Sequence, residues 1–79
     1  MGWPIVQDAE TTEDVRREVG WLCQRLATRR QTARNLLFRV VVEVLGRPLG
    51  RDARLRATEE ELLAIRDDLR ERMKRQGRE

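Results

Sequence analysis

The chain has 79 residues and a net charge of +3, from 17 basic and 14 acidic side chains. Its composition excludes most catalytic chemistry, because it has no His, Ser or Tyr, one Lys and one Cys, whereas catalysis near neutral pH relies on those residue types. The lone Cys23 lacks partners for a disulfide or a zinc site, and we interpret it as a small core hydrophobe. We therefore expect a single-domain, non-enzymatic binding protein without a metal or cofactor.

No segment resembles a targeting or membrane sequence. The N-terminal residues lack a basic region followed by an apolar run. The longest apolar stretches, 36–38 and 40–42, are split by Arg39 and are far too short to span a bilayer. We expect a cytosolic protein. The excess of sixteen arginines over one lysine indicates a GC-rich coding source, such as an actinobacterium or its phage.

Residues 1–10 show no periodicity, and Pro4 favours extended geometry for Trp3, which predicts an extended N-terminal arm. A first helix is expected from Thr11 or Thr12 to about residue 27, because a threonine cap is followed by acidic residues that suit the positive end of the helix dipole. Its apolar stripe has the spacing of one helix face and consists of Val15, Val19, Leu22 and Leu26.

The second element, residues 32–45, has two interpretations. As a helix it ends at Gly46, a natural left-handed cap, and Asn35, Arg39 and Glu43 form a polar stripe at four-residue spacing. As a strand, residues 38–44 alternate valines with charged residues, a pattern that sheets favour. We favour the helix, because a lone strand has no partner in the rest of the chain, although in a dimer it could pair with its own copy.

Residues 46–57 contain two glycines and a proline and predict a loop, with Leu49 and Leu55 as its anchors on the core. The last helix, residues 58–75, has the clearest start signal, because Thr58 and Glu61 have capping-box spacing. Asp68 and Arg72 can pair one turn apart. Its apolar stripe comprises Leu62, Ile65, Leu69 and Met73.

These elements predict an all-α fold: a small three-helix domain at residues 11–76, preceded by the arm at 1–10 and followed by a frayed tail at 77–79. The alternative is an α+β fold with a strand at 38–44 that pairs in a dimer. A domain of this size buries only about 60% of its unfolded surface, so we expect self-association, most simply as a dimer. The expected seam lies on the second helix and comprises Leu37, Val40, Val41 and Val44.

Positive charge is concentrated in the middle of the chain. Residues 19–58 carry nine arginines against Glu43 and Asp52, a balance of +7. The candidate contact residues around the start of the second helix are Arg29, Arg30, Gln31, Arg34, Asn35 and Arg39. The candidate contacts in the loop are Arg47, Arg51, Arg54 and Arg56.

Two functions fit this distribution. We favour a regulatory protein that presents a helical face and its arginines to an acidic protein partner, because the second helix is more apolar than recognition helices usually are. The alternative is a DNA-binding regulator of helix-turn-helix type, in which Gln31, Arg34 and Asn35 contact bases at the start of the second helix and Arg29 and Arg30 hold phosphates. No membrane partner is expected.

Overall fold

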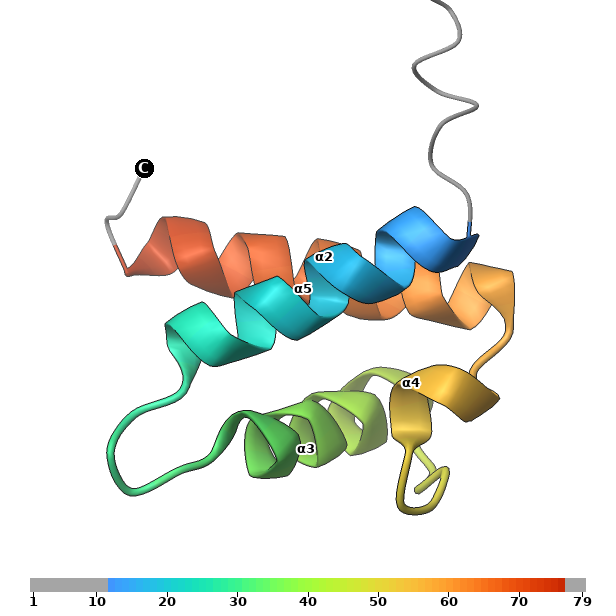
Figure 1. Ribbon diagram of the computed structural model, residues 1–79, viewed down its shortest axis with the longest axis horizontal. Coiled ribbons are helices and arrows are strands. Elements are labelled where there is room, and N and C mark those ends of the chain that lie inside the picture. The colour runs from blue at the N-terminus through green and yellow to red at the C-terminus, as the bar shows by residue number, and fades with distance from the viewer. Residues whose placement is uncertain (1–11, 77–79) are drawn as a thin grey trace, which may run out of the picture.

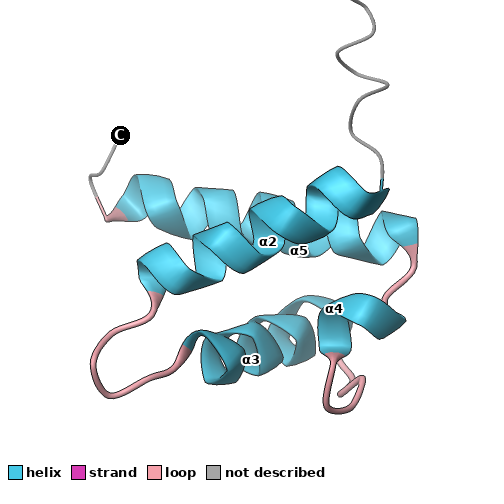
Figure 2. Cartoon of the chain, viewed as in Figure 1, coloured by secondary structure: helices cyan, strands magenta, loops and turns pink. Residues whose placement is uncertain are grey.

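The computed structural model describes residues 12–76, and every regular element in this range is an α-helix (Figure 1 and Figure 2). In chain order the helices are α2 (Thr12–Leu26), α3 (Ala33–Leu45), α4 (Ala53–Arg56) and α5 (Glu59–Arg75). The predicted all-α fold with three long helices is confirmed. The alternative strand is excluded, because residues 38–44 lie within α3. The predicted arm and tail, residues 1–10 and 77–79, lie outside the described residues.

The two later long helices begin and end where local chemistry predicts. The Thr32 side chain caps α3 by accepting a hydrogen bond from the Asn35 backbone N–H at 3.2 Å. Gly46 ends α3 in the left-handed region, with φ of 75°, and donates its N–H to the Val42 carbonyl. Such a backbone favours glycine, which has no Cβ to clash.

The start of α5 is a complete capping box. The Glu61 N–H donates to the Thr58 hydroxyl at 3.2 Å, and the Thr58 N–H donates to the Glu61 carboxylate at 3.1 Å. Two backbone donors without helical partners are thereby satisfied. The capping-box prediction is confirmed, and the observed starts and ends of the three long helices lie within one residue of those expected.

The core lies among the three long helices. α2 packs along α5, and α3 contacts both, while α4 closes one end of α3 (Figure 1). The apolar stripes predicted on α2 and α5 face inward, and Cys23 is buried with them, as expected. The residues that are fully buried include Val19, Val40, Val41, Leu62, Ile65 and Leu69.

The segment between α3 and α5 differs in part from the expected loop. It contains the single-turn helix α4, which buries Ala53 completely. Leu49 packs partly against the core, as predicted, but Leu55 is 53% exposed, so its role as an anchor was a wrong prediction. The physical reason is the turn of helix itself, because it directs Ala53 inward and leaves Leu55, two residues later, on the other side.

Ion pairs join helices that are distant in sequence. Glu18 of α2 accepts two hydrogen bonds from Arg70 of α5, at 2.6 and 3.0 Å, and lies 4.0 Å from the nearly buried Arg66. Arg72 of α5 pairs with Asp68 at 2.7 Å, as its spacing predicts, and also with Glu43 of α3. These contacts join α5 to both of the other long helices.

Candidate binding surface

The structure places the first set of predicted contact residues on one exposed region. Arg29 and Arg30 form the turn between α2 and α3, and Arg34, Asn35 and Arg39 are exposed on the first half of α3; Gln31, between turn and helix, is half-buried. Asn35 and Arg39 are four residues apart and so share one face of α3, whereas Gln31 precedes the helix.

The loop arginines separate into two kinds. Arg47 is tied to Glu61 of α5 by a salt bridge, so it holds the loop to the capping box. Arg51 and Arg54 instead line a pocket together with Arg34 of α3. Arg56 lies beside Gly50, where its guanidinium would be 3.0 Å from an added Cβ.

Carboxylate partners are missing around the start of α3. Within residues 12–76, salt bridges engage arginines at positions 16, 17, 47, 66, 70 and 72, and none engages Arg29, Arg30, Arg34, Arg39, Arg51 or Arg54. The cause lies in the sequence, since residues 19–58 contain only two acids and one of these, Glu43, pairs with Arg72. The positive charge of this region is therefore available to a partner.

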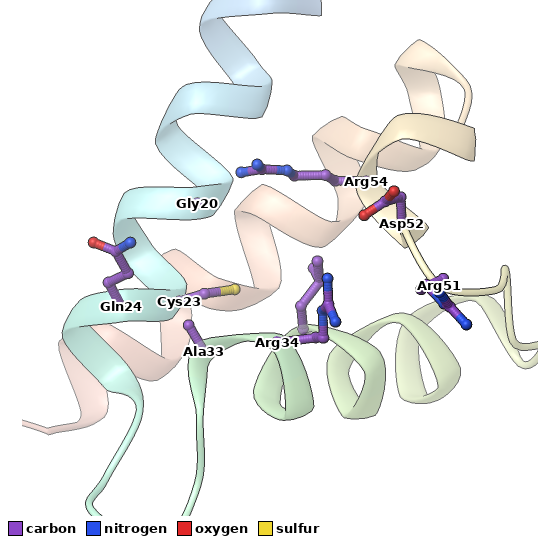
Figure 3. Close-up of a pocket in the computed structure, with 9 residues that line it drawn as sticks. Gly20, Cys23, Gln24, Ala33, Arg34, Arg51, Asp52 and Arg54 are labelled. Atoms are coloured by element: carbon purple, nitrogen blue, oxygen red, sulfur yellow. The ribbon is translucent and has the colours of Figure 1, made fainter.

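A pocket of about 190 Å³ opens between α2, α3 and α4 (Figure 3). Arg34 rises into it from α3, Arg54 crosses it toward Gly20 of α2, and the Asp52 carboxylate faces the space between them, with Arg51 at the outer end. The lining residues are Gly20, Cys23, Gln24, Ala33, Arg34, Leu37, Arg51, Asp52 and Arg54. The sequence predicted that Arg34, Arg51 and Arg54 make contacts, but it did not predict that they line one pocket.

Gly20 makes room for one of these arginines. A Cβ added at Gly20 would lie 2.5 Å from a terminal nitrogen of Arg54, closer than real contacts allow. The absent side chain thus lets the Arg54 guanidinium lie directly against α2. Glycine lowers helix stability at such a position. In return, Gly20 provides the space that the Arg54 guanidinium occupies.

The Cys23 sulfur lies at the inner wall of this pocket (Figure 3). Burial raises the pKa of the Cys23 thiol to about 11, a rise that the nearby charge of Arg54 only partly opposes. The group is therefore a neutral thiol at physiological pH, and it acts as apolar lining.

An apolar hollow lies on the adjoining surface of α3. It has a volume of about 370 Å³, and its lining comprises Phe38, Val42, Pro48, Gly50 and Arg51. Val42 is 44% exposed, although most valines of this helix are covered. The sequence pattern did not identify Phe38, Val42 and Pro48 as surface residues, because apolar residues occur on nearly every side of α3.

The predicted self-association residues require a correction. Val40 and Val41 are fully buried in the chain's own core, so neither presents surface to a second copy. Leu37 and Val44 are half-buried and pack partly against the same core. The physical reason is that α3 contacts both α2 and α5, and these helices cover the side of α3 on which the predicted seam lies.

Trp21 is an exposed aromatic residue on α2. It lies beside the apolar stripe of this helix, and 55% of its surface is exposed. The Arg25 guanidinium lies over its ring, 5.5 Å from the centroid, in a cation–π contact. The aromatic ring and cation share the outer side of α2.

No group of three metal-ligating side chains occurs within residues 12–76. None of the helices in that range has both the length and the apolar character needed to cross a membrane. The sequence matches no family model, and neither a curated protein nor a solved structure matches it.

Proposed function

We propose that this chain is a non-enzymatic binding protein whose contact surface is the exposed face of α3 and the adjoining loop. The observation that carries the proposal is the combination of an apolar hollow with surrounding arginines that form no salt bridge to any carboxylate of residues 12–76. Arg34, Phe38 and Val42 follow one another at four-residue spacing on one side of α3. Arg51 adds a second positive charge at the edge of the hollow.

The partner that fits this surface is an acidic protein segment with a few apolar side chains. Apolar side chains would fill the hollow over Phe38 and Val42, while carboxylates would meet Arg34, Arg39 and Arg51. Interfaces of this kind combine a buried apolar centre with a polar rim. Complementary charge raises association rates and rejects partners of like charge.

A second copy of the chain fits the same surface less well. A symmetric dimer applies the same patch on both subunits, and would bring the arginines of the two rims together. Such a pairing repels, and no acidic side chain lines the hollow. The proposal therefore favours a different, acidic partner over the dimer expected from chain length.

A displayed library of random peptides tests this proposal. We expect selection on the pure protein to enrich peptides that combine Asp or Glu with Leu or Phe, and their affinity to fall as salt is raised. Val42→Arg should abolish binding of the selected peptides. Leu55→Arg is the matched control, since Leu55 is similarly exposed but lies outside the hollow, and it should bind as the wild type does.

Two results would contradict the proposal: enrichment of peptides without acidic residues, or equal binding by the wild type and the Val42→Arg variant. Light scattering on the unliganded protein measures its molar mass and so tests the dimer alternative. A dimer that Val42→Arg dissociates would assign the surface to a second copy instead.

A DNA-binding role is the second candidate, and the observation in its favour is the exposure of Arg29, Arg30, Arg34, Asn35 and Arg39 without acid partners. Such a surface can neutralise phosphates and release counterions. A titration of duplex DNA at several salt concentrations tests it. This role predicts a linear fall of log affinity with log salt, with a smaller slope in an Arg29→Ala, Arg30→Ala double variant. Absence of binding at low salt would exclude it.

A further inference from the structure

We infer that the pocket between α2, α3 and α4 is a binding site for a phosphate group, held by Arg34 and Arg54 with Arg51 at its open end. This pocket adjoins the protein-binding surface proposed above, and Arg34 and Arg51 belong to both, whereas Arg54 and Gly20 belong to the pocket alone. It would give the chain a small-molecule ligand, either inorganic phosphate or a small phosphomonoester.

The charge of the pocket matches a dianion. Three guanidinium groups and one carboxylate line it, so the lining carries a net charge of 3 − 1 = +2. No salt bridge joins Asp52 to any of these arginines within residues 12–76. Guanidinium groups that line one pocket repel one another, and a tetrahedral dianion relieves this repulsion while accepting charge-assisted hydrogen bonds.

The size of the pocket also suits a phosphate group. Its volume is about 190 Å³, which corresponds to roughly six water molecules at about 30 Å³ each. A phosphate group, with five non-hydrogen atoms joined by short covalent bonds, fits within such a space and leaves room for part of a small organic remainder. Any organic remainder of the ligand would extend through the opening beside Arg51, and the Asp52 carboxylate would accept a hydrogen bond from a hydroxyl there.

Gly20 is the feature that ties the fold to this site. Because it has no side chain, the Arg54 guanidinium can lie against α2, across the pocket from Arg34 (Figure 3). Gly20→Ala would force that guanidinium away, since the new methyl group would lie 2.5 Å from its terminal nitrogen. The helix itself would not suffer, because alanine favours helix more than glycine does.

The test is a titration of the full chain with inorganic phosphate at about pH 8, where the anion is largely doubly charged. Ionic strength is held constant with chloride, and binding is followed by amide chemical shifts in NMR spectra. We expect a saturable shift centred on residues around Gly20, Arg34 and Arg54. Arg54→Ala should weaken binding about tenfold or more, the size expected for loss of a charged hydrogen bond. Gly20→Ala should weaken it severalfold while leaving the melting temperature unchanged or higher.

Arg75→Ala is the charge-matched control, since Arg75 is exposed in the last turn of α5 and lies outside the pocket and outside both proposed binding surfaces. It should change phosphate affinity by less than about twofold, because exposed charges are well screened. Glycerol phosphate, titrated in parallel, separates the two sources: tighter binding than inorganic phosphate assigns the site to a phosphomonoester, and equal binding assigns it to the free anion. No saturable shift, or equal losses in Arg75→Ala and Arg54→Ala, would overturn the inference. Neither outcome affects the peptide-library test, which depends on Val42.

Discussion

Between α2 and α5, arginine side chains form ion pairs that join the two helices, whereas the arginines around the start of α3 and in α4 form no salt bridge within the described part of the chain. Arg66 and Arg70 share Glu18 across the α2–α5 contact. Arg34 and Arg54 only line a pocket. One residue type thus has a structural role on one side of the molecule and is left for contact on the other, and the placement of the acids determines which role applies.

The largest effect on stability should come from the apolar core beneath the α2–α5 contact. Leu69 is fully buried in α5, and Leu69→Ala should lower the free energy of unfolding by about 2–5 kcal/mol, because it removes apolar contacts and leaves a cavity. Urea denaturation followed by circular dichroism measures this. Leu55→Ala is the control, and its exposed site should cost less than about 0.5 kcal/mol. Similar losses in both variants would contradict the assigned core.

Removal of Glu18 tests the structural arginines directly. Glu18→Ala deprives Arg70 of two hydrogen bonds and leaves the 7% exposed Arg66 with a weaker set of partners. We expect a loss of about 1–3 kcal/mol in unfolding free energy, measured in the same urea series. Glu13→Ala, which removes an exposed pair with Arg16 at 3.8 Å, should cost less than about 0.5 kcal/mol. Equal losses in the two variants would mean that the ion pairs between α2 and α5 add nothing to the free energy of unfolding.

The capping box at the start of α5 gives a smaller effect. Thr58→Ala removes the hydroxyl that accepts the Glu61 N–H and should cost about 1 kcal/mol. Thr32→Ala removes the corresponding cap of α3 and should cost a similar amount. Thermal melts of the two variants measure both costs, and an unchanged melting temperature in either would show that the cap is dispensable.

The same box predicts a pH dependence. The hydrogen bond from the Thr58 backbone, with the nearby Arg47 guanidinium, lowers the pKa of Glu61 below its ordinary value of 4.5. A carboxylate with a depressed pKa in the folded state stabilises the fold above its unfolded pKa, and this contribution is lost as pH falls through the folded value. Wild-type melting temperature should therefore fall on acidification below about pH 4.5. In Glu61→Gln this fall should be shallower; a parallel curve would contradict the assignment.

The smallest effect on stability is expected from the exposed arginines around the start of α3. Arg30→Ala combined with Arg39→Ala should change the unfolding free energy by no more than about 0.5 kcal/mol, because both side chains are exposed and neither forms a salt bridge within residues 12–76. The measurement is again urea denaturation. A larger loss would show that these arginines support the fold. The contrast between them and the arginines of the α2–α5 contact would then be wrong.

Local signals predicted most of the fold. Thr32 and Thr58 as caps, Gly46 as the end of α3, and the Asp68–Arg72 pair all depend on residues within four positions of one another, so sequence spacing alone identifies them. The helix α4 was missed because a single turn between Asp52 and Ala57 leaves too short a pattern for periodicity to detect.

The candidate sites were harder to predict, because they depend on contacts distant in sequence. The bond between Glu18 and Arg70 joins residues 52 positions apart, and no spacing rule reveals it. Contacts of this kind, between residues far apart in the sequence, determine which arginines pair with a carboxylate in the fold. In the same way, Val40 and Val42 are alike in sequence, and only the packing of α3 against two other helices buries the first and exposes the second.

The position of Cys23 has a practical consequence. It is the single cysteine of the chain, 2% exposed, with a thiol pKa of about 11, so a thiol reagent can reach it as a thiolate only when the helices separate. Its labelling rate therefore measures how often the native protein opens at the junction of α2 with α3, without any engineered probe. Bound phosphate should slow that labelling, because a ligand held by α3 and α4 against α2 stabilises the closed arrangement of these helices.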